Sequence, residues 1–145
     1  PISNEAYYNE RVKPELNDES IIYLGHLDHN SLNALIGKCR ATLFLSTWEE
    51  PYGLAIAESL ACGTPVVAYN KGAAPEILTP SCGVLVEEHD IKALVAATTY
   101  AMGLSRKDCR ERAEKFCSIE DMVSAYEQLY AELISQGKEK QLLSS

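Results

Sequence analysis

The sequence predicts an α/β fold, a doubly wound parallel sheet with flanking helices. Short apolar runs alternate with helical patterns along the chain, and the runs lack the in/out alternation of half-exposed strands. Strand and helix that alternate in this way are typical of parallel strands joined by right-handed crossovers. The four runs that we interpret as strands are Ile21–Gly25, Ala41–Ser46, Pro65–Tyr69 and Gly83–Glu87.

The connections between these runs have helix signals. Ser31–Cys39 carries apolar residues at helical spacing, and Ser31 is the candidate N-cap. Gly53–Cys62 is followed by Gly63, which favours a helix end at that point. A short turn at Ala74–Leu78 makes the third connection.

Both ends of the chain also have helical patterns. Before the first strand, Ser3–Val12 predicts a helix that Pro14 halts. After the last strand, Asp90 is expected to cap a helix that runs to about Met102. Two further helices are expected, with serine N-caps that each precede an aspartate by three residues. These N-caps are Ser105 and Ser118.

The last helix has an apolar row that we expect to pack on the rest of the domain. The row consists of Met122, Tyr126, Leu129 and Leu133. Residues 136–145 are expected to be a frayed C-terminal tail, so the predicted domain covers residues 1–135.

Composition restricts the class of protein. The 145 residues, 46% hydrophobic and 23% charged, fit one globular domain. The net charge of -8 argues against a nucleic-acid or anionic-membrane surface. Five cysteines without a Cys-x-x-Cys spacing indicate reduced thiols in a cytoplasmic protein. The chain starts at Pro1 without a methionine, so we expect a piece of a longer protein and membrane association only through a missing domain.

Ligands of open parallel sheets bind beyond the carboxyl ends of the strands, which directs attention to three loops. These loops are Gly25–Asp28, Ser46–Tyr52 and Asn70–Gly72. None of them is a Gly-x-Gly-x-x-Gly or Gly-Lys-Ser/Thr phosphate loop. No histidine, cysteine or carboxylate set has metal-ligand spacing, so no metal is expected.

A lone acid, Glu58, lies in the otherwise uncharged helix that the second loop enters. The helix pattern indicates burial nearly all round, so its carboxylate needs a partner or a ligand. A structural role, with Lys71 or a backbone group as the partner, is the alternative. The first amides of the helix, near Gly53, form an anion site. A nucleotide sugar fits this pattern, with its phosphate at the helix end, hydroxyls near Glu50 and a diol near Glu58.

The stretch "EPYGLAIAESLACGTPVVA", followed by "KGAAPEIL", resembles the donor-site signature of retaining glycosyltransferases of the GT-B fold, the group-one or family-four class. The resemblance covers nearly the whole chain and implies a Rossmann-like domain, the C-terminal half of that fold. It implies that Glu50, the candidate catalytic residue, holds hydroxyls of the donor sugar without attacking it. The other donor-binding residues that we expect are Tyr52, Gly53 and Leu54 at the sugar and phosphate, Glu58 at the ribose, Gly25, His26 and Leu27 along the base, and Lys71 at a phosphate.

The resemblance also implies the reaction and the partners. The donor is a nucleotide diphosphate sugar such as a UDP-, GDP- or ADP-sugar, and the glycosyl group is transferred with retention to an acceptor held by an N-terminal domain. The family's first strand-helix-strand unit would lie before Pro1, so the isolated chain is expected to be inactive. Two alternatives stay open, a sugar-nucleotide epimerase of the same fold and a non-catalytic nucleotide-binding or interaction module.

Overall fold

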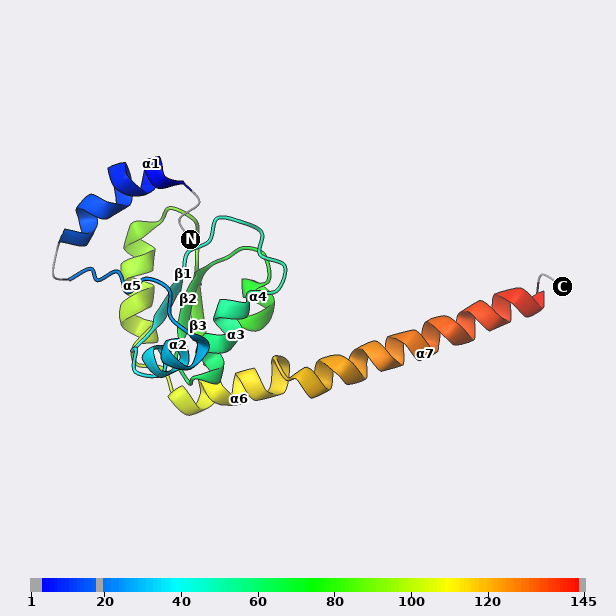
Figure 1. Ribbon diagram of the computed structural model, residues 1–145. Coiled ribbons are helices and arrows are strands. Elements are labelled where there is room, and N and C mark those ends of the chain that lie inside the picture. Colours follow the sequence, from blue (N-terminus) through cyan, green and yellow to red (C-terminus); the bar gives the residue numbers. More distant parts are fainter. Residues whose placement is uncertain (1–3, 18–19, 144–145) are drawn as a thin grey trace. The chain divides into compact units, whose positions relative to one another are not determined.

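The computed structural model describes residues 4–17 and 20–143 (Figure 1). Contacts divide the chain into two compact units, residues 1–34 and 35–145, whereas the sequence predicts a single one. The larger unit contains the sheet.

The sheet has three parallel strands, in the order β1-β2-β3 (Figure 1). Thr42 pairs with Val66, and Val66 pairs with Gly83. The strands are β1 (Thr42–Phe44), β2 (Val66–Tyr69) and β3 (Gly83–Val86). The predicted α/β class with a parallel sheet is confirmed, and three of the four predicted strands are present among the described residues.

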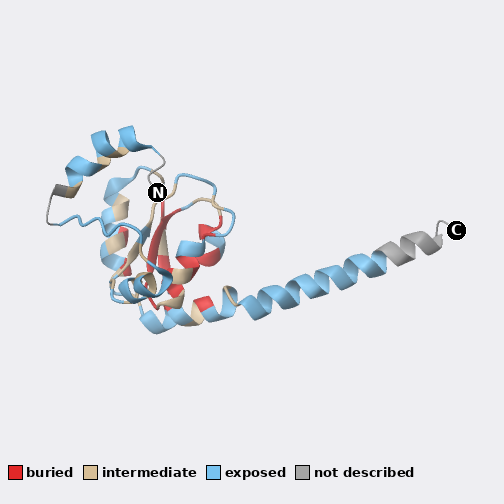
Figure 2. Ribbon diagram, in the orientation of Figure 1, coloured by how far each residue is buried: buried red, intermediate tan, exposed pale blue. Residues whose placement is uncertain are grey.

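Strand β2 is buried throughout, because helices cover both faces of the sheet (Figure 2). Val66 and Ala68 belong to one apolar cluster, and Val67 and Tyr69 belong to another. Alternate residues of a strand point to opposite faces, so this division means a core on each side. It is the doubly wound arrangement that the continuous apolar runs predict.

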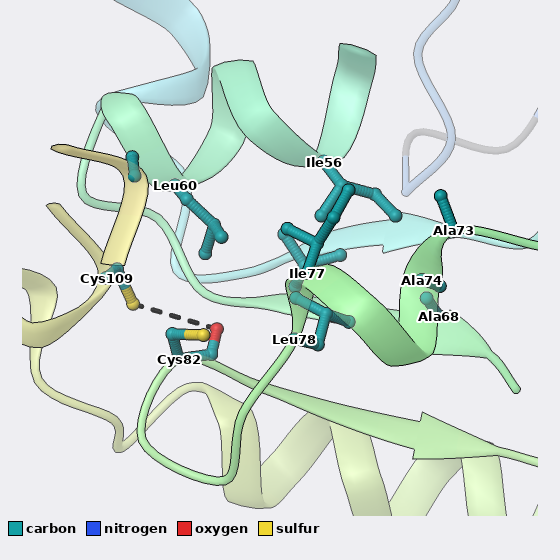
Figure 3. Packing of buried hydrophobic residues seen from close by; sticks show 11 residues of the cluster. Ile56, Leu60, Ala68, Ala73, Ala74, Ile77, Leu78, Cys82 and Cys109 are labelled. Carbon is teal, nitrogen blue, oxygen red and sulfur yellow. Dashed lines mark hydrogen bonds between the residues drawn. The ribbon is translucent and has the colours of Figure 1, made fainter. Parts of the chain in front are cut away.

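Four helices supply the two cores, namely α3 (Leu54–Ala61), α4 (Ala74–Ile77), α5 (Ile91–Ala101) and α6 (Arg106–Phe116). Ile56 and Leu60 of α3 and Ile77 of α4 fill the first core, which α6 closes with Cys109 (Figure 3). The second core lies under α5, which contributes Ala97 and Ala101.

Three predicted helix caps are confirmed. The Asp90 carboxylate accepts from the Ala93 N–H at 2.9 Å. The hydroxyl oxygens of Ser105 and Ser118 accept from the N–H groups three residues later, each at 3.2 Å. Each cap satisfies a donor that the first turn of a helix leaves unpaired.

The predicted cap at Ser31 is wrong. Helix α2 (His29–Ile36) begins earlier, and Asp28 accepts the hydrogen bond from the Ser31 N–H at 3.0 Å. The Ser31 hydroxyl also donates to the Asp28 carboxylate at 2.6 Å, and this bond lowers the pKa of Asp28. A carboxylate therefore occupies the position where its charge is favourable to the helix dipole.

The N-terminal helical pattern is confirmed from Glu5 onward, Ser3 lies outside the described residues, and the predicted end of the helix is wrong. Helix α1 (Glu5–Tyr7) is followed by a π-helical turn, η1 (Tyr8–Val12), and a 3-10 turn, η2 (Lys13–Asn17). Pro14 lies in the first turn of η2, so the helical backbone continues past it instead of ending there.

The predicted strand at Ile21–Gly25 is wrong, because these residues form no regular element. The side chains from Ile21 to Leu24 are between 46% and 73% exposed. A strand needs a neighbouring strand to receive its backbone hydrogen bonds, and no described residue supplies one. The apolar run alone therefore does not form a strand among the described residues.

Helix α7 (Ile119–Leu143) has an apolar face that is largely exposed over the residues whose burial is described. Met122, Tyr126, Leu129 and Leu133 are between 47% and 55% exposed, so the expectation that this row packs on the domain is wrong for the described residues (Figure 2). The helix also continues through most of the segment expected to be a tail. Over the described ranges, no helix combines the length and the apolar character needed to cross a bilayer.

All five cysteines are free thiols, as predicted. Cys82 and Cys109 are fully buried in the first core, where the Cys109 thiol donates to the Cys82 carbonyl at 3.7 Å (Figure 3). Burial raises the pKa of the Cys109 thiol to about 11. This thiol therefore acts as a small apolar side chain.

Candidate functional site

The first turn of α3 has backbone amides that are unpaired among the described residues. Gly53 precedes the helix with a left-handed backbone, φ 77° and ψ 52°, which favours glycine. Its carbonyl accepts from the N–H groups of Ile56 and Ala57 at 2.9 and 3.2 Å. Among the described residues, none accepts a hydrogen bond from the Gly53, Leu54 or Ala55 N–H. With the positive end of the helix dipole, these amides can bind an anion.

Glu58 lies in the second turn of α3, at the border of the core. Helix α3 is buried on one side only, through Ile56, Ala57, Ser59 and Leu60, so the predicted burial all round is wrong. Glu58 is half-buried, and its carboxylate has no hydrogen bond or ion pair to any described residue. The carboxylate is thus available to a ligand and is also partly solvated.

Lys71 is not the partner of Glu58. Its ammonium lies 2.9 Å from the Glu88 carboxylate, in an ion pair whose side chains are 28% and 32% exposed. The hydrogen bond to Glu88 raises the pKa of Lys71, and the same bond lowers the pKa of Glu88. Lys71 therefore stays charged at neutral pH, but a carboxylate already balances its charge. This finding weakens the structural alternative for Glu58 and also the predicted phosphate contact of Lys71.

Glu50 is held through its main chain. Its carbonyl accepts from the Ala73 N–H at 2.8 Å, and its own N–H donates to the Trp48 carbonyl at 2.9 Å. The side chain is half-buried and has no hydrogen bond or ion pair among the described residues. The loops after β1 and β2 are therefore joined directly at the candidate catalytic residue.

A cavity of about 510 Å³ lies beside α3, within the usual size range of small-molecule sites. Three predicted donor-binding residues line it, namely Tyr52, Leu54 and Glu58. The opposite wall comes from α6 and the start of α7 and includes Arg110, Cys117 and Ile119. The structure thus brings these three predicted residues to one cavity, whereas Glu50, Gly53 and Lys71 do not line it.

Sequence reasoning missed the α6 wall of the cavity. Arg110 lies there, but its guanidinium is already occupied by the Ala61 carbonyl at 2.5 Å and the Glu114 carboxylate at 2.7 Å. Burial raises the pKa values of Tyr52 and Cys117 above their ordinary values, so both are neutral at pH 7. The α6 wall is separated from α3 in sequence by more than a whole strand-helix unit, and no local pattern in it signals a site.

Tyr52 also borders a second cavity, of about 340 Å³, next to α4 and the first turns of α7. Pro51, Glu76 and Met122 line this cavity. The loop before α3 thus separates two hollows of the larger unit.

Gly25, His26 and Leu27 belong to the smaller unit, residues 1–34. Gly25 has a left-handed backbone, φ 68°, and no atom lies within 4 Å of where its Cβ would be. The predicted contact of this loop with a base stays a prediction.

No group of three or more histidine, cysteine or acidic side chains that could hold a metal ion occurs in the part of the chain that the structure describes. The described residues of α3 and of the larger cavity offer unpaired amides, a carboxylate without a partner and an apolar wall. These groups suit a ligand with an anionic group, hydroxyls and an apolar part.

Comparisons with known proteins give one family. Residues 3–116 match the model described as "Glycosyl transferases group 1". An uncharacterized 41.2 kDa protein of the cps region of Klebsiella pneumoniae is 30% identical over 124 residues, 82% of this chain and 34% of that protein. The chain therefore spans about a third of the length of that curated relative.

Solved structures have the same fold. AviGT4, a glycosyltransferase involved in avilamycin A biosynthesis, superposes with a TM-score of 0.78 at 23% identity, over 93% of this chain and 42% of its own. Anabaena HepE, solved in complex with UDP-glucose, superposes with a TM-score of 0.67 at 22% identity, over 92% and 38%. At 22–23% identity, this likeness shows that the fold is shared.

Proposed function

Because the chain belongs to the group 1 glycosyltransferases, we propose that it is the donor-binding domain of a retaining enzyme that uses a nucleotide diphosphate sugar. One observation carries the proposal. The wall of the larger cavity contains both Leu54, in the exposed first turn of α3, and Glu58, whose carboxylate has no partner among the described residues. A nucleoside diphosphate supplies an anion and a diol, which are the groups that these two features bind.

Each residue then has a role in this proposal. The amides of Tyr52, Gly53 and Leu54 bind the diphosphate, and the Glu58 carboxylate accepts hydrogen bonds from the ribose diol. Glu50 accepts hydrogen bonds from the hydroxyls of the donor sugar. Gly25–Leu27 lie along the base. Lys71 reaches a phosphate only if its ammonium leaves Glu88, with which it is paired.

The reaction in this proposal breaks the bond between the anomeric carbon and the diphosphate oxygen and forms a bond from that carbon to an acceptor hydroxyl oxygen, whose proton leaves with the diphosphate. Negative charge develops on the leaving diphosphate while the sugar takes oxocarbenium character. Amides fixed at the start of α3 stabilise that charge without reorganising, which lowers the barrier. Glu50 orients the sugar and does not attack it.

We further propose that an acceptor-binding domain faces this one in the whole protein. The exposed apolar row of α7 supports this proposal, because a contiguous row of this kind marks an interaction surface. UDP-glucose bound to the relative HepE supports the donor class. The free cysteines are consistent with a reducing, cytoplasmic location.

Substitution of Glu58 tests the proposal. The Glu58→Ala variant should bind UDP or GDP at least tenfold more weakly, because hydrogen bonds to a charged group are each worth roughly 1.5–3 kcal/mol and about 1.4 kcal/mol is tenfold in affinity. Calorimetry or NMR titration with both diphosphates measures this. The control is Glu127→Ala, which removes the same charge from the exposed surface of α7 and should change nothing. Equal affinities of Glu58→Ala and the wild type would remove Glu58 from the ribose site.

A further inference from the structure

Two loops at the carboxyl end of the sheet are joined by a pair of hydrogen bonds. The Gly72 N–H donates to the Glu49 carboxylate at 2.8 Å, and the Ala73 N–H donates to the Glu50 carbonyl at 2.8 Å. The two donors are consecutive in the loop after β2, and the two acceptors are consecutive in the loop after β1. We call this pair of bonds the Glu49–Gly72 clasp.

The clasp brings the two main chains unusually close. A Cβ on Gly72 would lie 2.6 Å from both the nitrogen and the oxygen of Glu50, a separation that side chains do not adopt. Gly72 also has a left-handed backbone, φ 54°. Only glycine therefore permits this approach, and it places the Gly72 main chain directly against that of Glu50.

Glu49 also contributes to the charge balance of the loop after β2. The pKa of Lys71 is raised first by the hydrogen bond to Glu88 and, more weakly, by the charge of Glu49. Glu49 itself is exposed, and its carboxylate accepts a hydrogen bond from the backbone amide of Gly72. An exposed carboxylate that bonds a backbone amide of another loop fixes loop geometry.

The Glu50 side chain lacks such a support. Its carboxylate has no hydrogen bond or ion pair among the described residues, so its direction depends on where the main chain at Glu50 is held. The main chain is held by the clasp and by the Glu50 N–H, which donates to the Trp48 carbonyl at 2.9 Å.

We infer that Glu49 is a positioning residue that acts through Glu50, fixing the carboxylate that meets the donor sugar. The inference rests on the proposed function, in which Glu50 contacts that sugar. Glu49 does not touch the ligand in this account. Its loss should weaken recognition of the sugar and leave recognition of the nucleoside diphosphate intact.

The clasp itself can be tested without any ligand. Amide hydrogen exchange at Gly72, followed by NMR on the 145-residue chain, should be on the order of tenfold faster in Glu49→Ala than in the wild type. Glu49→Gln should keep most of the protection, because its amide oxygen accepts the same bond. The matched control is Glu88→Gln, which removes the partner of Lys71 and should leave Gly72 protected. Unchanged exchange in Glu49→Ala would overturn the inference whatever the protein binds.

The positioning role is tested by the difference between two ligands. NMR titration with UDP-glucose and UDP, and with GDP-mannose and GDP, gives the added affinity due to the sugar. Glu49→Ala should lose that added affinity as Glu50→Gln does, with the affinity for the diphosphate within about twofold of wild type, and Glu49→Gln should retain it. Equal losses in Glu49→Ala and Glu49→Gln would indicate a charge effect and overturn the inference. A wild-type chain that binds neither diphosphate would overturn the proposed function, and this inference with it, even if Gly72 exchange behaved as expected.

Discussion

At the residue scale, a close contact between two main chains restricts which amino acid a position can hold more strongly than a charged pair does. Gly72 has a backbone and a neighbour that exclude any Cβ, whereas Lys71 next to it takes part in a partly exposed ion pair. Partly exposed ion pairs contribute little to stability because water screens them. The loop after β2 therefore depends on its glycine more than on its lysine.

Gly72→Ala should destabilise the fold by roughly 2 kcal/mol or more, since a left-handed backbone alone costs about 1–2 kcal/mol for a residue with a Cβ and the new methyl group would press on Glu50. Urea unfolding measures the change. The control is Gly103→Ala, whose Cβ would lie at an ordinary 3.4 Å from the Tyr100 carbonyl oxygen, the nearest atom among the described residues. Similar unfolding free energies for the two variants would contradict the close approach at Gly72.

The residue scale also shows what a sequence can and cannot indicate about a site. The spacing of Glu50 and Glu58 and the glycine before α3 predict where a ligand would bind, because they act within one segment. The Glu49–Gly72 clasp and the α6 wall of the cavity join segments far apart in the chain, and no local pattern specifies them. The pairing of Lys71 with Glu88 was missed for the same reason.

At the element scale, arginines of α6 donate hydrogen bonds to backbone carbonyls at the C-terminal ends of other helices. These bonds fasten the helix ends to α6. Arg106 donates to the carbonyls of Gly37 and Cys39, just after α2, and of Cys62, just after α3. Arg112 donates to the Glu76 and Ile77 carbonyls at the end of α4, each at 2.7 Å, and stacks on Phe116. The last carbonyls of a helix lack partners within the helix and carry its negative end, so an arginine there satisfies both needs.

Arg106→Ala should therefore lower the free energy of unfolding by about 2 kcal/mol, because hydrogen bonds to charged groups are worth roughly 1.5–3 kcal/mol and those of one guanidinium do not add fully. Thermal or urea unfolding measures it. Lys107→Ala is the matched control, since that side chain is 83% exposed and its ammonium lies 3.5 Å from the Glu111 carboxylate in a surface ion pair. If the control destabilised the chain as much as Arg106→Ala, α6 would not have the fastening role described above.

A strand or helix cap is predicted correctly from the sequence where the described chain contains the groups that hydrogen-bond to it. The strand at Val66–Tyr69 is as expected because β1 and β3 pair with it on both sides. The caps Asp90, Ser105 and Ser118 are local and were all correct. The run at Ile21–Leu24 has the same apolar character but no neighbouring strand among the described residues, so its composition alone does not make it a strand.

At the scale of the whole molecule, charge opposes the proposed ligand. The chain has a net charge of -8, and the arginines of α6 are committed to backbone carbonyls. Lys71, the lysine of the candidate loops, is paired with Glu88. The diphosphate would thus meet the amides of α3 in a field that is repulsive overall, which lowers the affinity for an anion.

We therefore expect residues 1–145 to fold, to bind a nucleoside diphosphate weakly and to transfer no sugar. Transfer needs an acceptor held against the anomeric carbon, and such positioning accounts for a large part of the barrier reduction. In a protein of the length of the Klebsiella relative, of which this chain covers 34%, the added residues should strengthen diphosphate binding and supply transfer.

Affinity for UDP and GDP, and transfer from radiolabelled UDP-glucose or GDP-mannose, would be compared between the two lengths. Raising the ionic strength should weaken the general repulsion and narrow the difference in affinity, but it should not give the short chain any transfer activity. Sustained transfer by the 145-residue chain alone would show that the acceptor site lies within it and that no facing domain is needed.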